Sequence, residues 1–441
     1  PPLSFWLTAL AAKLGPLRYV AVHSLGAIFS TFAQYFVARH CLYTMSEKAS
    51  VVAILLGVTS PFATYLAIQY NHNIALMPFW AMTIAFALNA FETNDTKHWA
   101  LLGLVVGLGI WAKYAIGLLC LPLLCAFLLI PAWRRSLATV RPYVAVVVFL
   151  LIVTPHFLAV YQQGGRTIQY AFRVWHNDFT ERLANAFLII YIAALSNALM
   201  LVILGIGGGF LNIWIALRSV VASALKLEPK ATFYTLAAFG PVLIIFYAAF
   251  LGVRVRALWI TPITLGFVFW WAYVALQSEH TLSLRRMIAA AASVYGVHLV
   301  AYLIMRLIWP YRADVRYPEV DAVKLTADAH SYWKREKGTE LSHIIIVGNQ
   351  RSLQAAGTIA FNTPQRLLVR MQQAIPFMRP VVIDRIMREG ALIVSVTRLN
   401  SVGTSMPERL GPFTVSNAET QLLPKVRGIT SRTQIVFAIA Q

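Results

Sequence analysis

The chain has 441 residues, of which 59% are hydrophobic and only 12% are charged, and its mean hydropathy is +0.66. Soluble globular domains are usually about 45–50% apolar and about 25% charged, so this composition excludes an ordinary soluble protein. The net charge is +20, but the basic residues are spread over the loops between apolar segments, which argues against a nucleic-acid-binding stripe.

The apolar residues form about ten runs near the ~20 residues that a membrane-spanning helix needs. Helices are expected because lipid cannot satisfy unpaired backbone polar groups. Residues 2–14 are too short to span and are predicted to lie at the membrane interface. The fourth span contains Gly103, Gly107 and Gly109, and we expect it to pack closely against a neighbour. The spans are predicted at residues 17–37, 51–70, 74–91, 99–111, 114–130, 144–161, 187–211, 235–251, 259–276 and 288–308.

The basic residues indicate how the chain is oriented, because cytoplasmic loops carry an excess of Lys and Arg. One set of alternate loops holds eleven: Arg39, Lys48, Lys97, Arg134, Arg135, Arg141, Arg218, Lys226, Lys230, Arg285 and Arg286. The other set holds six, namely Lys113, Arg166, Arg173, Arg182, Arg254 and Arg256, or eight with Lys13 and Arg18. The first set is therefore predicted to be cytoplasmic, which places Pro1 and the segment after Trp309 outside. We expect one further helix to precede Pro1.

The composition changes after Trp309, where charges become dense and strand and helix signals alternate. Strands are predicted at 343–347, 366–371, 391–396 and 434–440, and helices at 351–361 and 380–389, the second closed by Gly390. The predicted fold is an all-α polytopic membrane domain over residues 1–309 and a small extracytoplasmic α/β domain over residues 310–441. Residues 347–350 lack the spaced glycines of a dinucleotide fingerprint, and no nucleotide cofactor is expected.

Lys113 is the most informative of the basic residues predicted to face outward. It lies at the mouth between two apolar helices, where an ammonium group in a low dielectric binds an anionic headgroup strongly. The alternative is a lysine that only snorkels to the water. In the loop after the sixth span, Arg166, Arg173 and His176 lie among aromatic residues and suit a phosphate and a sugar. The alternative there is an amphipathic helix at the interface.

Polar side chains in two further places are candidates for binding a sugar. Asn71, His72 and Asn73 form a short outer hairpin and offer donors and acceptors to hydroxyl groups, although asparagines also suit a plain turn. His156 lies inside an apolar helix, where an ionisable group is a functional candidate or is hydrogen-bonded to a neighbour. Sugar transfer to a hydroxyl also needs a carboxylate base. Before Trp309, only Asp178 and Glu181 are predicted to face outward.

Several motifs together resemble a known family. Residues 1–6 resemble the end of a His-Pro-Pro-Leu segment, residues 107–114 resemble a Gly-Leu-x-x-x-x-Lys-Tyr segment, and residues 70–80, 154–156 and 356–364 resemble parts of one subgroup. The family is the bacterial branch of the dolichyl-phosphate-mannose protein mannosyltransferase-like glycosyltransferases, which have the GT-C fold. The chain is similar to its lipid A aminoarabinose and lipopolysaccharide-core sugar transferases.

The resemblance implies inverting transfer of a hexosyl or pentosyl group from a polyprenyl-phosphate sugar. By the resemblance, Lys113 would contact the donor phosphate. Together with the arguments above, we predict that Lys113, Arg166 and Arg173 bind the donor phosphate and that Asn71, His72, Asn73, Tyr114 and His156 bind the sugar or the acceptor. His176 is similar to a histidine that helps to hold a divalent metal ion. The family's Asp-Glu catalytic motif lies upstream of the Pro-Pro-Leu segment. We therefore expect that the first helix and first catalytic loop precede Pro1, with Asp178 or Glu181 as the fallback base.

The sequence thus predicts a multi-pass glycosyltransferase of the bacterial inner membrane with a periplasmic active site. Its partners would be a polyprenyl-phosphate sugar, membrane lipids, and an acceptor such as lipopolysaccharide, lipid A, another glycan or protein. The main alternative is a polytopic transporter or lipid flippase, which would favour internal repeats and ionisable groups at the midplane. A structural assembly protein is a third possibility.

Overall fold

The structure is a computed structural model, and its contacts divide the chain into two compact units, Pro1–Val300 and Ala301–Gln441. The division falls within the last helix of the membrane domain, and the predicted boundary after residue 309 remains a prediction. The structure describes residues 2–14, 17–61, 64, 67, 70–162, 178–253, 255–308, 321–347, 350–363, 367–371, 380–398, 408–422 and 433–440.

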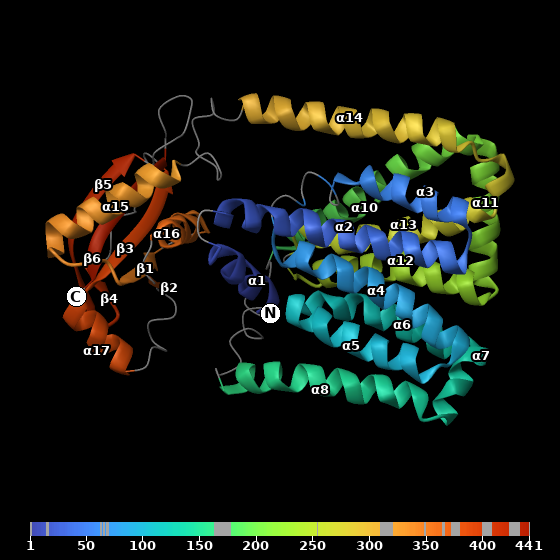
Figure 1. Ribbon diagram of the computed structural model, residues 1–441, viewed down its shortest axis with the longest axis horizontal. Coiled ribbons are helices and arrows are strands. Elements are labelled where there is room, and N and C mark those ends of the chain that lie inside the picture. Colours follow the sequence, from blue (N-terminus) through green and yellow to red (C-terminus); the bar gives the residue numbers. More distant parts are fainter. Residues whose placement is uncertain are drawn as a thin grey trace. The chain divides into compact units, whose positions relative to one another are not determined.

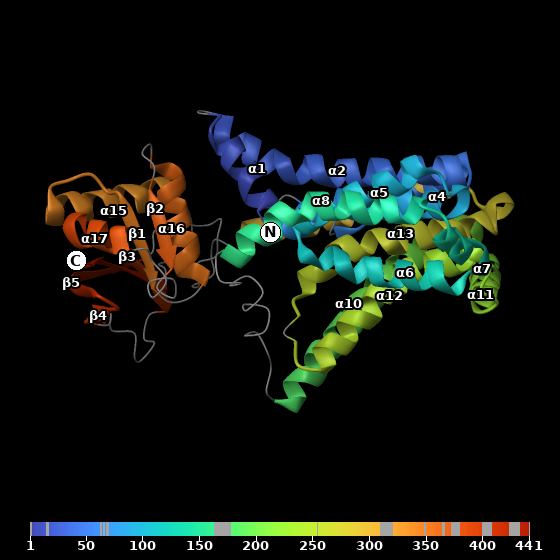
Figure 2. The same cartoon turned by 90° about the horizontal axis from the view of Figure 1, so that it is seen from below.

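The first unit is a helical bundle whose long helices run up and down roughly one axis (Figures 1 and 2). Its helices are α1 (Leu3–Ala12), α2 (Arg18–Thr44), α3 (Glu47–Val58), α4 (His72–Thr93), α5 (Thr96–Ala112), α6 (Gly117–Leu129), α7 (Pro131–Arg134), α8 (Arg141–Gln162), α10 (Phe179–Gly208), α11 (Phe210–Leu225), α12 (Pro229–Phe250), α13 (Ile260–Leu276) and α14 (Leu284–Ile308). Short 3-10 turns are η4 (Tyr114–Ile116), η5 (Arg135–Ala138), η6 (Ala257–Trp259) and η7 (Glu279–Thr281).

All ten predicted spans have a helical counterpart, which confirms a multi-pass membrane protein. Among the described residues, seven helices are long and apolar enough to cross a bilayer, or eight if α6 and the bent segment after it form one span. The two remaining counterparts are α3, with 12 residues, and α5, with 17. At ~1.5 Å per residue these reach about 18 Å and about 26 Å, short of the ~30 Å hydrocarbon core.

The second predicted span differs most from the structure. A single helix was expected over residues 51–70, but α3 ends at Val58. Pro61 explains the stop, because it has no N–H to donate to the carbonyl of Gly57 and its ring disfavours helix at the preceding residue. The backbone N–H of Ser60 donates to that carbonyl instead, over 3.1 Å, and closes the helix with a tighter turn.

The predicted close packing of the glycine-rich helix is confirmed. A Cβ atom added at Gly103 of α5 would lie 2.2 Å from the backbone oxygen of Ala145 in α8, and one at Gly107 would lie 2.8 Å from the side chain of Ile152. These glycines let α5 and α8 approach almost backbone to backbone, as small residues do between membrane helices. The approach matters for the site because Lys113 directly follows α5.

Helix α11 was not predicted as a separate element. Gly209, with φ of +83°, ends α10 three residues before the predicted limit of that helix and begins α11. Helix α11 lies across one end of the bundle (Figure 1). It buries Ile213, Ala216 and Val220 at helical spacing and leaves Trp214 exposed, so it is amphipathic.

The two sets of loops that the basic residues define in the sequence lie at opposite ends of the bundle. The connections α2–α3, α4–α5, α6–α8 and α13–α14 all lie at the end where α11 crosses (Figure 1). These connections and the helix turns next to them, with α11 and the start of α12, carry the eleven basic residues of the predicted cytoplasmic set. The connections that hold Lys113 and Arg256 lie at the opposite end. The bundle therefore has one strongly basic end.

The second unit contains one six-stranded mixed sheet in the order β2-β1-β3-β6-β5-β4. Strands β2, β1 and β3 are parallel, whereas β6, β5 and β4 join antiparallel. Helices α15 and α16 pack on one face and α17 on the other. The elements are α15 (Ala322–Lys337), β1 (His343–Val347), α16 (Gln350–Asn362), β2 (Leu368–Met371), α17 (Pro380–Glu389), β3 (Ala391–Arg398), β4 (Arg409–Leu410), β5 (Phe413–Leu422) and β6 (Thr433–Ala440).

Every element predicted for this unit is present, which confirms the small α/β domain. Gly390 ends α17 with φ of +79°, as expected for a helix-terminating glycine. The sequence reading missed α15, β4 and β5. A helical membrane domain followed by this α/β unit is the fold class that the sequence predicted.

Candidate functional site

Lys113 lies where α5 ends, at the less basic end of the bundle. Its backbone is extended, with φ of −166° and ψ of 135°, so the chain turns away from the helix axis there. Its Nζ donates to Oδ1 of Asn73 over 2.5 Å and lies 4.6 Å from the ring centre of Trp259. Asn73 is only 4% exposed, so the ammonium group points into the protein and does not reach for water as a snorkelling lysine would.

No carboxylate among the described residues pairs with Lys113. An amide oxygen and an indole face stabilise a cation without neutralising it. A cation held in a partly buried place by neutral partners keeps its capacity to bind an anion. The arrangement therefore favours a phosphate-binding role over a structural ion pair.

The predicted polar hairpin forms the start of α4. Asn71 caps the helix, and its Oδ1 accepts hydrogen bonds from the backbone N–H of Asn73 over 2.8 Å and from the Asn73 side-chain amide over 3.0 Å. Because the Asn73 nitrogen is used in this way, its oxygen is turned toward Lys113. Asn71 thus has the structural role of a helix cap. Asn73 connects that cap to the candidate site.

His72 is exposed at the first residue of α4. It is near enough to Lys113 and Arg256 for both charges to act on its ring. Lys113, at the end of α5, and Arg256, in the connection before α13, therefore both lie within electrostatic range of His72.

Tyr114 and His156 form a second polar pair beside Lys113. The Tyr114 hydroxyl lies 2.8 Å from Nε2 of His156, which is 8% exposed in α8. The indole of Trp111 donates to the carbonyl of Ile152 over 3.0 Å and its ring centre lies 5.8 Å from that of His156. His156 is therefore hydrogen-bonded to a neighbour, which was the predicted alternative to a functional role. That neighbour is Tyr114, the residue after Lys113.

The two fallback acids lie at the start of α10. The carboxylate of Asp178 caps this helix and accepts from the backbone N–H groups of Thr180 and Glu181 over 2.6 and 3.2 Å. These hydrogen bonds from Glu181 and Thr180 hold the pKa of Asp178 below its usual value. A carboxylate with a lowered pKa is a weaker base, so the geometry argues against Asp178 and leaves Glu181 as the better fallback.

Arg166, Arg173 and His176 lie outside the described residues, so the structure does not test them. Within the part of the chain that the structure describes, no group of three or more His, Cys, Asp or Glu side chains could hold a metal ion. The divalent metal therefore stays a prediction that depends on the segment containing His176.

Sequence reasoning did not single out Trp259 as a site residue. It was assigned to the start of an apolar span, where tryptophan is ordinary at a membrane interface. Its contact with Lys113 joins segments far apart in the sequence, and only the packing of α13 against α4 brings them together.

Comparison with known proteins supports the family inferred from the motifs. Residues 1–158, which include Asn73, Lys113 and His156, match the family described as dolichyl-phosphate-mannose-protein mannosyltransferase. The lipopolysaccharide core galacturonosyltransferase RgtA of Rhizobium johnstonii is 33% identical over 120 residues. That match covers 27% of this chain and 24% of RgtA, so it spans about a quarter of the relative's length.

The fold is also that of ArnT, whose structure has been solved. The crystal structure of ArnT from Cupriavidus metallidurans bound to undecaprenyl phosphate aligns with a TM-score of 0.59 over 99% of this chain and 87% of that chain, at 14% identity. Its apo form aligns with a TM-score of 0.56 at 15% identity. At such identities the likeness shows the fold, and it confirms the predicted GT-C-like architecture. The resemblance to lipid A and lipopolysaccharide-core sugar transferases is thereby confirmed.

Proposed function

We propose that this protein is a membrane glycosyltransferase that moves a sugar from a polyprenyl-phosphate donor to an extracytoplasmic acceptor. The observation that carries the proposal is Lys113, a cation held by Asn73 and Trp259 and paired with no carboxylate among the described residues. It lies within the stretch that matches the mannosyltransferase family. The alignment with ArnT bound to undecaprenyl phosphate adds support from the fold.

In this proposal Lys113 binds the donor phosphate while the polyprenyl tail remains in the bilayer. An ammonium in a site of low dielectric favours the negative charge that grows on the phosphate as the sugar leaves. Arg166 and Arg173 are proposed to add to this binding. Asn71, His72, Asn73, Tyr114 and His156 are proposed to face the sugar or the acceptor, because amide, imidazole and phenol groups match hydroxyl groups.

The proposed reaction is a single inverting displacement. A carboxylate takes the proton of an acceptor hydroxyl, the hydroxyl oxygen forms a bond to the anomeric carbon, and the bond to the lipid phosphate breaks. Of the two carboxylates proposed within this chain, Glu181 is preferred as the base, because the Asp178 carboxylate caps α10. A divalent metal held in part by His176 remains part of the proposal, and its test is loss of transfer on chelation and recovery on adding metal back.

The proposed location is the inner membrane of a bacterium, with the site and the α/β unit on the periplasmic side. RgtA acts on the lipopolysaccharide core, so a lipopolysaccharide or lipid A acceptor is the first to test. Whether the sugar is a hexose, a hexuronic acid or a pentose is the second question.

The test is a transfer assay with the purified full-length protein, radiolabelled polyprenyl-phosphate sugars and lipopolysaccharide acceptors in liposomes. Labelled acceptor is expected, and its formation should require the lipid phosphate, since a nucleotide sugar lacks the tail. Movement of the donor lipid between leaflets with no labelled acceptor would instead support the flippase alternative.

A further inference from the structure

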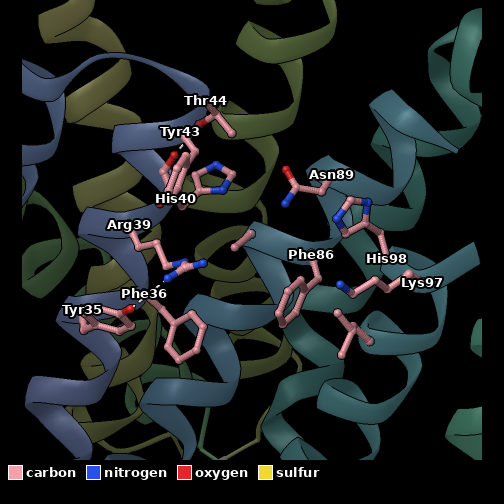
Figure 3. A pocket seen from close by; sticks show the side chains of 12 residues that line it. Tyr35, Phe36, Arg39, His40, Tyr43, Thr44, Phe86, Asn89, Lys97 and His98 are labelled. Carbon is pink, nitrogen blue, oxygen red and sulfur yellow. Dashed lines mark hydrogen bonds between the residues drawn. The ribbon is translucent and has the colours of Figure 1, made fainter. Parts of the chain in front are cut away.

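A pocket lies at the basic end of the bundle, away from Lys113. It has a volume of about 470 Å³, which is within the usual range for small-ligand sites, about 300–1,000 Å³. Helices α2 and α5 form its sides and α4 its floor (Figure 3). Its lining includes Tyr35, Arg39, Phe86, Asn89, Lys97 and His98. None of these residues belongs to the site described above.

Two cations face this pocket from opposite sides. Arg39 comes from α2 and Lys97 from the first turn of α5 (Figure 3). No Asp or Glu is among the described residues that line the pocket, and in the described ranges neither cation forms an ion pair. Asp95 caps α5 and accepts from the backbone N–H of Lys97 over 3.1 Å, so it offsets the unfavourable position of a cation at a helix N-terminus but forms no ion pair with the Lys97 ammonium. A bound anion would compensate both the Arg39 and the Lys97 charge.

Neutral groups hold Arg39, and His98 adds to the polar part of the pocket on the other side. Arg39 donates to the hydroxyl of Tyr35 over 3.0 Å, and its guanidinium carbon lies 5.2 Å from the ring centre of Tyr43. Across the pocket, Nδ1 of His98 lies 3.0 Å from the hydroxyl of Thr93. Tyrosine hydroxyl and aromatic contacts keep the guanidinium in place and leave its charge uncompensated.

The pocket is amphipathic. Phe36, Phe86 and Leu101 supply apolar walls next to the charged and amide groups. Arg39 is five residues before the end of α2, so it lies roughly 8 Å inside the helix end, at ~1.5 Å per residue. A free phosphate ion gains no favourable contact with the apolar walls. A ligand with a charged head and a hydrocarbon tail uses both parts.

We propose that this pocket binds the phosphate headgroup of an anionic membrane lipid, in the leaflet opposite to the Lys113 site. Helix α5 runs from Thr96, the residue before Lys97, to Ala112, the residue before Lys113, and its 17 residues span about 26 Å. That length is only a few ångströms short of the ~30 Å hydrocarbon core, so the two sites lie near opposite faces of the membrane. The inference rests on the pocket alone and does not depend on the proposed sugar transfer.

The test compares lipid binding by native mass spectrometry on the purified, delipidated protein. Phosphatidylglycerol and phosphatidylcholine with the same acyl chains are the probes. The variant carries R39Q and K97Q together, and the matched control carries R218Q and K226Q, which remove the same charge at the same end of the bundle from exposed positions on and just after α11. We expect the preference for phosphatidylglycerol to fall at least about tenfold in the variant and to stay within about twofold in the control.

Photo-cross-linking of the unmodified protein with a headgroup-labelled phosphatidylglycerol locates the site without any substitution. The expected adducts are on peptides that contain residues 35–44 and 85–101. An equal loss of preference in the control would show general attraction to a basic surface and would overturn the proposal, as would adducts spread evenly over the bundle. Full competition by inorganic phosphate at millimolar concentration would assign the pocket to a soluble anion instead of a lipid.

Discussion

At the scale of single residues, Lys113 shows how neutral partners prepare a cation for a ligand. Asn73 holds the ammonium through an amide oxygen, and Trp259 covers it with an indole face. A carboxylate in either position would have neutralised the charge and competed with a phosphate. The residue that fixes this arrangement is Asn71, because its cap of α4 turns the Asn73 oxygen toward the lysine.

The first prediction concerns the charge of Lys113. Lys113→Met removes a charged hydrogen bond to the donor phosphate worth roughly 1.5–3 kcal/mol. We expect transfer at subsaturating donor to fall about tenfold to over a hundredfold. Lys113→Arg should also lose activity, because a planar fork does not replace a compact ammonium group.

Lys226→Met is the matched control, since it removes a lysine charge from the exposed end of α11. It should keep the activity of the unmodified protein. Thermal stability in detergent should be similar for all variants. Full activity of Lys113→Met would remove this lysine from the site and leave Arg166 and Arg173 as the remaining phosphate candidates.

The second prediction separates the two fallback acids. Asp178→Asn keeps a good helix cap, since asparagine serves at that position as well as aspartate does. The Asp178 carboxylate, with its lowered pKa, is a weak base at neutral pH. We therefore expect Asp178→Asn to change the transfer rate by less than about twofold, measured at saturating donor and acceptor. A rate loss of a hundredfold or more with unchanged stability would make Asp178 the base after all.

Much of this site could be predicted from the sequence, because its members are local anomalies. Lys113 interrupts apolar helices, His156 lies inside one, and two asparagines flank His72. The structure joins Lys113 to Asn73 and Tyr114 to His156. Trp259 was not predictable in the same way, since tryptophan is common at membrane interfaces and only tertiary packing brings it to the lysine.

At the scale of elements, the contact of α5 with α8 depends on glycines. A Cβ atom at Gly103 would meet the backbone of Ala145, which cannot move without shifting α8. The third prediction is that Gly103→Ala lowers stability by about 1–3 kcal/mol or more through overpacking. The measurement is the midpoint of thermal unfolding in detergent.

Gly117→Ala is the control for this prediction. No atom lies within 4 Å of a Cβ added there, and Gly117 begins helix α6. Since alanine favours helix over glycine by about 1 kcal/mol, this variant should be neutral or slightly stabilised. Equal loss of stability in both variants would show that the α5–α8 contact is not the cause.

The elements that the sequence predicted well are those with a strong apolar pattern. Nine of the ten spans and the inner strands of the sheet belong to this class. The second span was predicted too long, because the apolar residues after Pro61 continue the pattern of a spanning helix. The structure ends α3 at Val58, before this proline. Strand β5 was missed because it is largely polar and exposed, and it is recognised only through its pairing with β6. Helix α15 did carry a signal, since Leu325, Ala329, Tyr332 and Trp333 are buried at helical spacing.

At the scale of the whole molecule, the main asymmetry is the distribution of charge along the bundle axis. Eleven basic residues belong to one set of alternate loops and six to the other. The bundle gathers the first set at the end where α11 lies, and the proposed lipid pocket opens among two of its members, Arg39 and Lys97. Since basic residues are retained on the cytoplasmic side, this end should face the cytoplasm.

The fourth prediction tests that orientation by cysteine labelling. Ser219 in α11 and Ser331 in α15 are both exposed, so a cysteine at either position can react. The three native cysteines, Cys41, Cys120 and Cys125, are first replaced. A membrane-impermeant maleimide should label Ser331→Cys in cells whose outer membrane has been permeabilised, whereas Ser219→Cys should react only after the inner membrane is broken. The reverse pattern would place the Lys113 end in the cytoplasm, where an extracytoplasmic acceptor could not reach it, and would refute the proposed reaction together with the orientation.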